Sequence, residues 1–87
     1  MADEGAPGDW EAVSRAMAGR MRQLRVSQVA VADAAHVSLS TVREIHRNIR
    51  QRRRRPYVLA AISRALAWPP DYLDRVLAGE RPQPRPE

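Results

Sequence analysis

The fold is decided by residues 27–48, "SQVAVADAAHVSLSTVREIHRN". On each side of residues 35–38 the apolar residues recur at the three- and four-residue steps of an amphipathic helix. The segment between the two patterns is too short for a flexible linker. Ser27 and Ser38 each stand where a helix N-cap would stand. The stretch therefore predicts two short helices locked at a fixed angle.

The turn between these helices contains residues that a tight corner needs. His36 occupies the position where a left-handed backbone conformation is expected. Glycine is the usual residue there, but histidine is one of the few others enriched in that conformation. Val37 is expected to pack under the corner, and Ser38 to cap the N–H groups of the next helix. The second helix, about residues 39–47, then presents its outer face at a defined angle.

That outer face is rich in side chains that can contact DNA bases. If Val42 and Ile45 are buried, the helical period turns four polar residues outward, and two more residues stand at the leading edge of the helix. The four are Ser40, Arg43, Glu44 and Arg47, and the two at the leading edge are Leu39 and Thr41. An arginine can bond to guanine through two N–H groups, and an apolar side chain can contact the methyl group of thymine. A glutamate is repelled by phosphate, so Glu44 must accept from a cytosine amino group or pair with a neighbouring arginine.

The basic charge is carried by arginine alone and is unevenly distributed. The net charge is +5, with fifteen basic residues and no lysine. Residues 1–11 hold four acidic residues, whereas residues 43–55 hold seven arginines against Glu44. This block predicts a strip that binds a polyanion, with a solvated flexible arm as the alternative.

The remaining patterns are helical too, so the predicted fold class is all-α with five helices. The first helix has an apolar stripe and Asp9 as its N-cap; the stripe is Trp10, Val13, Met17, Met21 and Leu24. The fourth begins at Pro56 and is broken at residues 68–70; it buries Leu59, Ile62 and Leu66. The fifth, about residues 70–78, ends at Gly79; its apolar residues are Tyr72, Leu73, Val76 and Leu77. One domain, residues 9–79, is expected between disordered tails at residues 1–8 (acidic) and 80–87 (Pro/Arg-rich).

The stretch "SQVAVADAAHVSLSTVREI" resembles the helix-turn-helix of the lambda repressor-like (Cro/XRE) family. The matching features are Ser27-Gln28, Val31-Ala32, Val37-Ser38, Val42 and Ile45. "RPYVLAAISRALAWPPDYL", residues 55–73, is similar to the fourth helix of that family and its proline-marked entry to the fifth. The resemblance covers about residues 10–79 and lies in the order and spacing of these features together.

The resemblance implies a five-helix DNA-binding domain whose third helix enters the major groove. The positions that contact bases in this family correspond to Leu39, Ser40, Arg43 and Glu44, with Thr41 beside them. Those that contact phosphate correspond to Gln28, Arg47, Arg50, Arg52, Arg53, Arg54 and Arg55. The chain departs from the pattern at three positions. His36 and Asn48 replace glycines, and Leu39 replaces a polar residue that bonds to the glutamine of the second helix in relatives.

Several other classes of protein are not expected. The chain has no cysteine, and His36 and His46 are predicted to be a turn residue and a surface residue rather than metal ligands. No serine, histidine and aspartate form a pattern for catalysis, and no glycine-rich phosphate loop is present. We therefore expect no enzyme, no cofactor and no metal. No apolar run is long enough for a membrane span, so a cytoplasmic, nucleoid-associated protein is expected.

The sequence thus predicts a regulator of transcription that binds double-stranded DNA sequence-specifically, with repression as the expected outcome. One recognition helix covers few base pairs, so a homodimer contacting half-sites about 34 Å apart is expected. Tyr72, Leu73 and Val76 either form its interface or close the core. The alternative is a protein-interaction module, such as an antitoxin or regulatory adaptor with a protein partner, whose surface would include Val29, Tyr72 and Val76.

Overall fold

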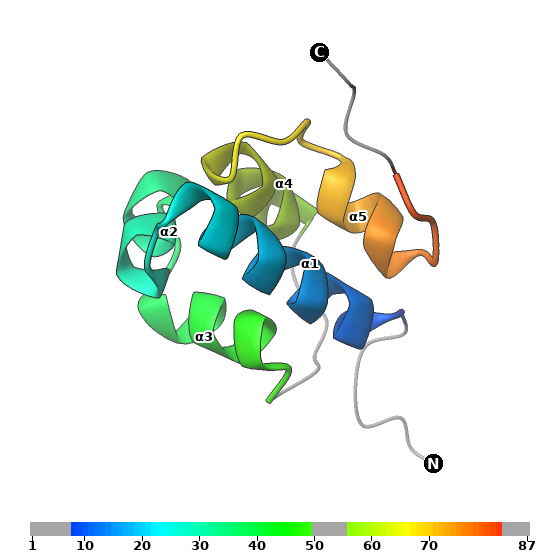
Figure 1. Ribbon diagram of the computed structural model, residues 1–87, viewed down its shortest axis with the longest axis horizontal. Coiled ribbons are helices and arrows are strands. Elements are labelled where there is room, and N and C mark those ends of the chain that lie inside the picture. Colours follow the sequence, from blue (N-terminus) through cyan, green and yellow to red (C-terminus); the bar gives the residue numbers. More distant parts are fainter. Residues whose placement is uncertain (1–7, 50–55, 83–87) are drawn as a thin grey trace.

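Five helices and no strand make up the described part of the chain, residues 8–49 and 56–82 of a computed structural model (Figure 1). They are α1 (Trp10–Leu24), α2 (Gln28–Ala35), α3 (Leu39–Arg47), α4 (Pro56–Ala65) and α5 (Tyr72–Leu77). The predicted all-α fold class and the predicted order of helices are confirmed. Among the described residues, no helix is long and apolar enough to cross a membrane.

The first three helices begin where the sequence predicts, because short polar side chains satisfy their first N–H groups. Asp9, Ser27 and Ser38 each accept a hydrogen bond from the backbone N–H three residues further on, at 3.0–3.1 Å. These are the predicted caps of α1, α2 and α3. Pro56 begins α4, where a missing N–H costs nothing. The helix α5 begins at Tyr72, later than the predicted start near residue 70.

The first four helices all end in the same way, and none uses glycine. Each is followed by a residue in the left-handed region, with φ between 53° and 64°; the four are Arg25, His36, Asn48 and Ala67. The next N–H after each then bonds to a carbonyl five residues back, at 2.9–3.2 Å. This Schellman-type ending satisfies carbonyls that the helix leaves free. His36 and Asn48 were predicted to adopt this conformation, whereas Arg25 and Ala67 were not, and α4 therefore ends before the predicted break at residues 68–70.

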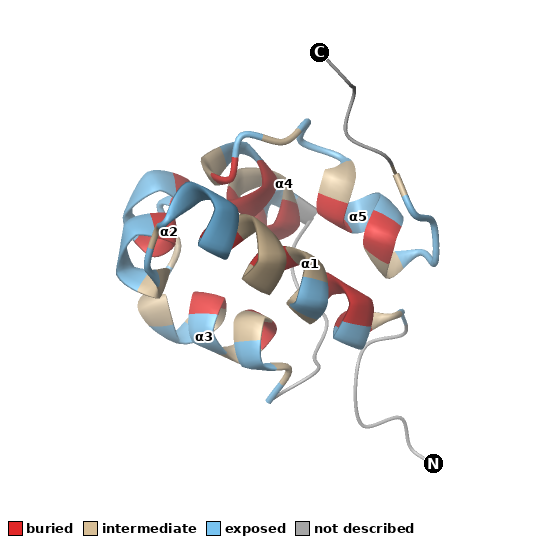
Figure 2. Ribbon diagram, viewed as in Figure 1, coloured by how far each residue is buried: buried red, intermediate tan, exposed pale blue. Residues whose placement is uncertain are grey.

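The helix α1 runs through the middle of the molecule and is in contact with α3 on one side and α5 on the other (Figure 1). The helix α2 packs on α3 and α4, and α4 packs on α5. All five helices contribute buried residues, which are red in Figure 2, and these residues form one core cluster. The least exposed large side chains are Val13, Met17, Val31, Val42, Ile62, Leu66 and Leu73. The predicted core is confirmed except at Leu24, which is 38% exposed, because the chain turns at Arg25 and Val26 packs against the core instead.

One polar side chain, Ser63, is fully buried and joins α4 to α5. Its exposed fraction is 0%, and its Oγ accepts a hydrogen bond from the backbone N–H of Leu73 at 3.2 Å. The carbonyl of Ser63 also accepts from the N–H of Trp68, at 2.9 Å. A single residue of α4 therefore fixes both the turn after α4 and the entry to α5.

Contacts between the two ends of the domain hold the first residues of the predicted C-terminal tail. Arg81 pairs with Asp9 at 3.2 Å, and the N–H of Asp9 bonds to the carbonyl of Leu77 at 2.9 Å. Gly8 has φ 129°, and a Cβ there would lie 2.5 Å from the Leu77 side chain, so the approach requires glycine. Gly8 and residues 80–82 are therefore described and lie beside these contacts, while the rest of the two tails predicted to be disordered lies outside the described residues.

Candidate nucleic-acid interface

The corner between α2 and α3 is held by local contacts. His36 has φ 59° and ψ 42°, the predicted left-handed conformation, and its side chain is exposed. Val37 is half-buried and packs against the core from below the corner. Ser38 caps α3 through Oγ and also donates to the hydroxyl of Thr41 at 2.9 Å. The start of α3 is therefore fixed relative to α2 by residues adjacent in the chain.

The helix α3 separates a buried side from a polar outer side. Val42 and Ile45 are 0% and 2% exposed, as predicted. Ser40, Arg43 and Arg47 are exposed, and neither arginine forms an ion pair with another described residue. Three arginine or serine side chains on one face can donate several hydrogen bonds to an acceptor outside the molecule.

The other three residues predicted to contact bases are half-buried, and two of them already have interactions within the protein. Leu39 is half-buried and packs against the core, and Thr41 is half-buried with its hydroxyl bonded to Ser38. Glu44 is also half-buried and already has an interaction within the protein. At Leu39, Thr41 and Glu44, α3 therefore exposes less polar surface than the helical period predicted.

Gln28, the predicted phosphate contact at the start of α2, is oriented by a residue that the sequence did not single out. Its side-chain amide donates from Nε2 to Nδ1 of His46 at 2.9 Å. A neutral His46 must then carry its proton on Nε2. His46, predicted to be a surface residue, is half-buried and keeps part of its side chain exposed. Its position directly after the buried Ile45, at the edge of the side of α3 that faces the core, could have predicted this partial burial.

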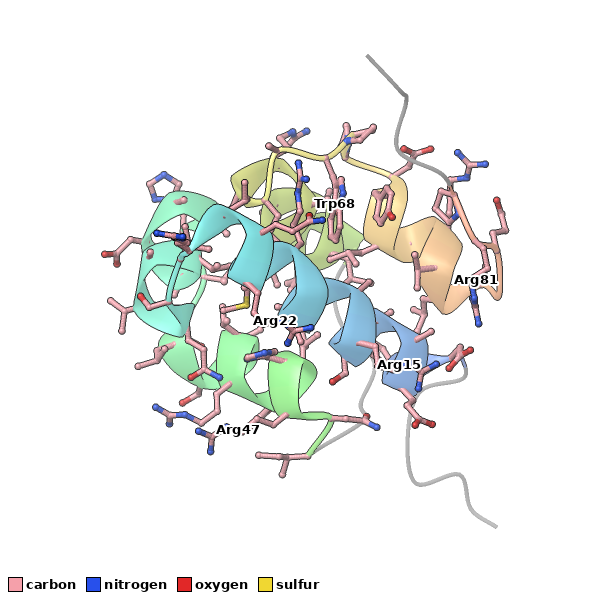
Figure 3. All side chains as sticks on the ribbon, viewed as in Figure 1. Arg15, Arg22, Arg47, Trp68 and Arg81 are labelled. Atoms are coloured by element: carbon pink, nitrogen blue, oxygen red, sulfur yellow. The ribbon has the colours of Figure 1, made fainter. Side chains whose placement is uncertain are left out.

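His46 also connects α3 to α1. The Ser14 hydroxyl donates to the His46 carbonyl at 2.6 Å, which ties the last turn of α3 to α1. Burial, and then the charges of Arg47 and Arg22, lower the pKa of His46 below its ordinary value of 6.5. Arg22 is exposed on the side of α1 nearest α3, and Arg47 lies on the far side of α3 (Figure 3). The basic surface at α3 therefore extends onto α1, which the sequence pattern alone did not predict.

The arginine block that follows α3 cannot be placed on this surface. The predicted phosphate contacts Arg50, Arg52, Arg53, Arg54 and Arg55 lie outside the described residues. The described arginines on the outer face of α3 are Arg43 and Arg47, and Arg22 lies on the adjoining side of α1.

The three residues predicted for a dimer interface are largely used within the protomer. Leu73 and Val76 are 0% and 4% exposed and belong to the core, so they are unavailable to a second copy in this conformation. Tyr72 is half-buried and stacks on Trp68, with ring centroids 3.9 Å apart. Val29 is 53% exposed, but its helix α2 does not pack on α5. These side chains therefore form no single exposed surface.

The described residues offer anion-binding groups rather than a metal site. Within residues 8–49 and 56–82, no three histidine, cysteine or acidic side chains gather as metal ligands would. The corner instead combines exposed arginines, a serine hydroxyl and an oriented glutamine amide. The chain matches no protein-family model, no curated protein and no solved structure. Its function is therefore inferred from its own residues and geometry.

Proposed function

We propose that the protein is a sequence-specific regulator of transcription that binds double-stranded DNA through a lambda repressor-like helix-turn-helix made by α2 and α3. The observation that carries this proposal is the exposed face of α3, which holds Ser40, Arg43 and Arg47 beside a corner fixed by Ser38. An α-helix with its side chains is about 10–12 Å across, which fits a major groove about 12 Å wide.

The side chains of this face divide into two roles. Arg43, in the middle of the exposed face, donates two hydrogen bonds to the edge of a guanine, and Ser40 contacts an adjacent base. Arg47 and Gln28 contact phosphates, and His46 holds the Gln28 amide in place for that contact. Phosphate contacts set the register of the helix, so discrimination between sequences falls on Arg43 and Ser40.

Binding as a homodimer is part of the proposal, because one α3 spans only a few base pairs. Two copies of α3 would lie about 34 Å apart, one turn of the duplex. Since Leu73 and Val76 are buried in the protomer, the second copy would contact the remaining exposed side of α5 or segments outside the described residues. A dimer on a promoter would repress by excluding other proteins from the DNA, without any catalytic step.

A selection of bound duplexes from a random pool, at about 150 mM salt where non-specific attraction is weakened, tests this function directly. The expected product is a palindromic site with half-sites one helical turn apart. An absence of any enriched sequence would contradict sequence-specific binding.

The Arg43→Ala variant then tests the proposed base contact. We expect a loss of about 1–3 kcal/mol on the selected site and little change on random DNA, because a bidentate contact to a base is specific. Arg64→Ala is the matched control, since Arg64 is an exposed arginine on α4. Equal losses on both kinds of DNA would make Arg43 a phosphate contact and contradict its role in discrimination.

A further inference from the structure

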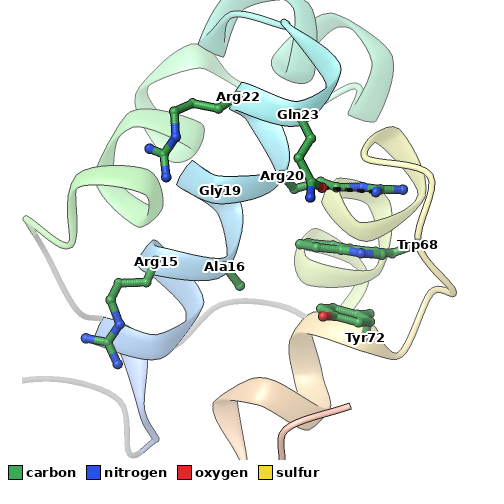
Figure 4. A pocket seen from close by; sticks show the side chains of 8 residues that line it. All are labelled: Arg15, Ala16, Gly19, Arg20, Arg22, Gln23, Trp68 and Tyr72. Atoms are coloured by element: carbon green, nitrogen blue, oxygen red, sulfur yellow. Dashed lines mark hydrogen bonds between the residues drawn. The ribbon is translucent and has the colours of Figure 1, made fainter. Parts of the chain in front are cut away.

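A groove lies over α1, between the side of that helix nearest α3 and the aromatic residues at the junction of α4 and α5 (Figure 4). Its volume is about 620 Å³. Arg15 and Arg22 stand on one side of α1, and the aromatic rings of Trp68 and Tyr72 stand on the other (Figure 4). The proposed DNA contacts use none of these four side chains.

The floor of the groove is made by small residues of α1. A Cβ added to Gly19 would meet no atom within 4 Å, so the helix backbone is open to approach at this point. Ala16, one turn earlier, lines the same groove. A second chain can therefore come close to α1 between the arginines and the aromatic rings.

The aromatic wall, formed by Trp68 and Tyr72, is held in place by its neighbours and exposes the edge of the Trp68 ring rather than its faces. The Arg20 guanidinium lies 5.5 Å from the centre of the Trp68 ring, and Tyr72 stacks on the same indole with an interplanar angle of 11°. Arg20 is fixed by hydrogen bonds to the carbonyls of Leu66 and Ala67, at 2.8 and 3.3 Å. With both faces of Trp68 covered, a nucleic-acid base cannot stack on it as it does in single-strand binding proteins. The edge of an aromatic ring carries partial positive charge.

The charge of the groove has one sign. Its lining contains three arginines, Arg15, Arg20 and Arg22, and no acidic residue. Arg22 has no ion-pair partner among the described residues. Arg15 pairs with Glu11 at 2.9 Å, but the two side chains are 64% and 72% exposed, so the pair is weak and can be exchanged. Both walls of the groove therefore favour carboxylates.

A duplex bound to the outer face of α3 would not reach the aromatic wall of this groove. In Figure 3, α1 lies between Trp68 and Arg47, so the aromatic wall is separated from the outer face of α3 by the width of a helix. A second hollow of about 380 Å³ shares Arg15, Ala16 and Tyr72 with the groove and continues to Arg81. The surface is thus elongated along α1, and its shape suits a helix or a strand rather than a small molecule.

From this geometry we infer that the groove is a docking site for an acidic segment of a partner protein. Arg15 and Arg22 are seven residues apart, two turns of α1 or about 10 Å. A helix lying along the groove meets both when its own carboxylates are also two turns apart. Small apolar residues between those carboxylates would cover Ala16 and Gly19, opposite the ring edges of Trp68. This inference does not depend on DNA binding.

The test uses the full chain and a labelled helical peptide of about 14 residues, four turns, with pairs of glutamates two turns apart and alanine and leucine between them. Binding is followed by fluorescence anisotropy at several salt concentrations. The same peptide with glutamine at the acidic positions is the control for charge. We expect the acidic peptide to bind in a salt-sensitive manner and the glutamine peptide to bind at least about tenfold more weakly.

Two variants locate the binding. Gly19→Leu adds a side chain to the floor, where its Cβ meets no atom within 4 Å, and replaces glycine with a better helix former, so we expect the fold to be retained, which circular dichroism checks. Arg15→Gln removes one charge from the rim, and Arg64→Gln removes the same charge outside the groove. We expect about tenfold weaker peptide binding for Gly19→Leu and a clear loss for Arg15→Gln, with Arg64→Gln unchanged.

Four results would overturn the inference. Binding that Gly19→Leu leaves unchanged would place the peptide elsewhere. Equal losses for Arg15→Gln and Arg64→Gln would leave only a general attraction between opposite charges. An acidic peptide that does not bind at all would show that the groove is no docking site for carboxylates. Loss of duplex DNA binding in Gly19→Leu as large as the loss of peptide binding would assign the groove to nucleic acid.

Discussion

The corner between α2 and α3 and the junction between α4 and α5 both turn the chain through a left-handed residue, but different contacts hold them. At the corner, the Ser38 hydroxyl bonds to Thr41, three residues away. At the junction, Arg20 bonds to the carbonyls of Leu66 and Ala67, which are 46 and 47 residues away in the chain. The start of the proposed DNA-contacting helix is thus positioned by local chemistry, whereas its last turn is tied to α1 through Ser14. The aromatic wall of the α1 groove is positioned by contacts between distant segments. Substitutions that weaken the packing of the helices should therefore disrupt the groove more than the corner.

The largest expected effect on stability comes from removing a serine hydroxyl, one at the junction and one at the corner. Ser63→Ala deletes a fully buried acceptor and leaves the N–H of Leu73 without it, which should lower the free energy of unfolding by about 2 kcal/mol. Ser38→Ala deletes an exposed cap and should cost about 1 kcal/mol. Urea unfolding of both variants measures these losses.

The two serine variants should also differ in what they do to function. Ser38→Ala loosens the start of α3 and should weaken DNA binding beyond its effect on stability, whereas Ser63→Ala should leave the DNA affinity of the folded protein near that of the wild type. Two results would contradict this comparison of a locally held corner with a junction held by tertiary contacts. One is a larger loss of stability for Ser38→Ala than for Ser63→Ala. The other is weaker DNA binding in Ser63→Ala alone.

The corner could be predicted from the sequence because its determinants are neighbours in the chain. Caps at Ser27 and Ser38, the left-handed His36 and the buried faces of Val42 and Ile45 are all properties of a few adjacent residues. Helix order followed from the same local patterns. The partner of Gln28 could not be predicted, because His46 lies 18 residues further along the chain and its contact depends on how α2 packs against α3.

The junction could not be predicted for the same physical reason. The pattern placed the end of α4 at the Trp68-Pro69-Pro70 break, but the helix ends at Ala65 because Ala67 turns left-handed. An alanine gives no local signal for that conformation. It is adopted where Ser63 bonds to Trp68 and Arg20 holds the carbonyl of Ala67. The candidate groove beside it was missed because no single helix contains it.

Glycine substitution at the left-handed residues gives the next largest effect. Ala67 has φ 64°, where a Cβ costs about 1–2 kcal/mol and glycine costs little, so Ala67→Gly should raise the free energy of unfolding by about 1 kcal/mol. Asn48 has φ 53°, but asparagine tolerates this region and Asn48 already has an interaction within the protein, so Asn48→Gly should stabilise the protein less than Ala67→Gly. Thermal or urea unfolding of the pair provides the measurement. If Asn48→Gly stabilises the protein as much as Ala67→Gly, or more, then other contacts at the junction offset the strain of the left-handed Ala67.

The smallest effect concerns pH and His46, which links the corner to α1. Burial, Arg47 and Arg22 lower the pKa of His46, so the folded protein takes up this proton less readily than the unfolded chain. The contribution of His46 to stability is therefore complete well above pH 6.5 and is lost as the pH falls through 6.5 toward the lower pKa of the folded state. Below that pKa both states are protonated and the loss stops growing.

His46→Gln isolates this contribution, since the glutamine keeps an oxygen that can accept from the Gln28 amide and has no proton to titrate near neutral pH. Urea unfolding at about pH 7.5 and about pH 5.5 should show a larger fall in stability for the wild type than for His46→Gln. Equal falls would mean that the neutral ring is not favoured in the folded protein, and that Gln28 is not held by Nδ1 of His46.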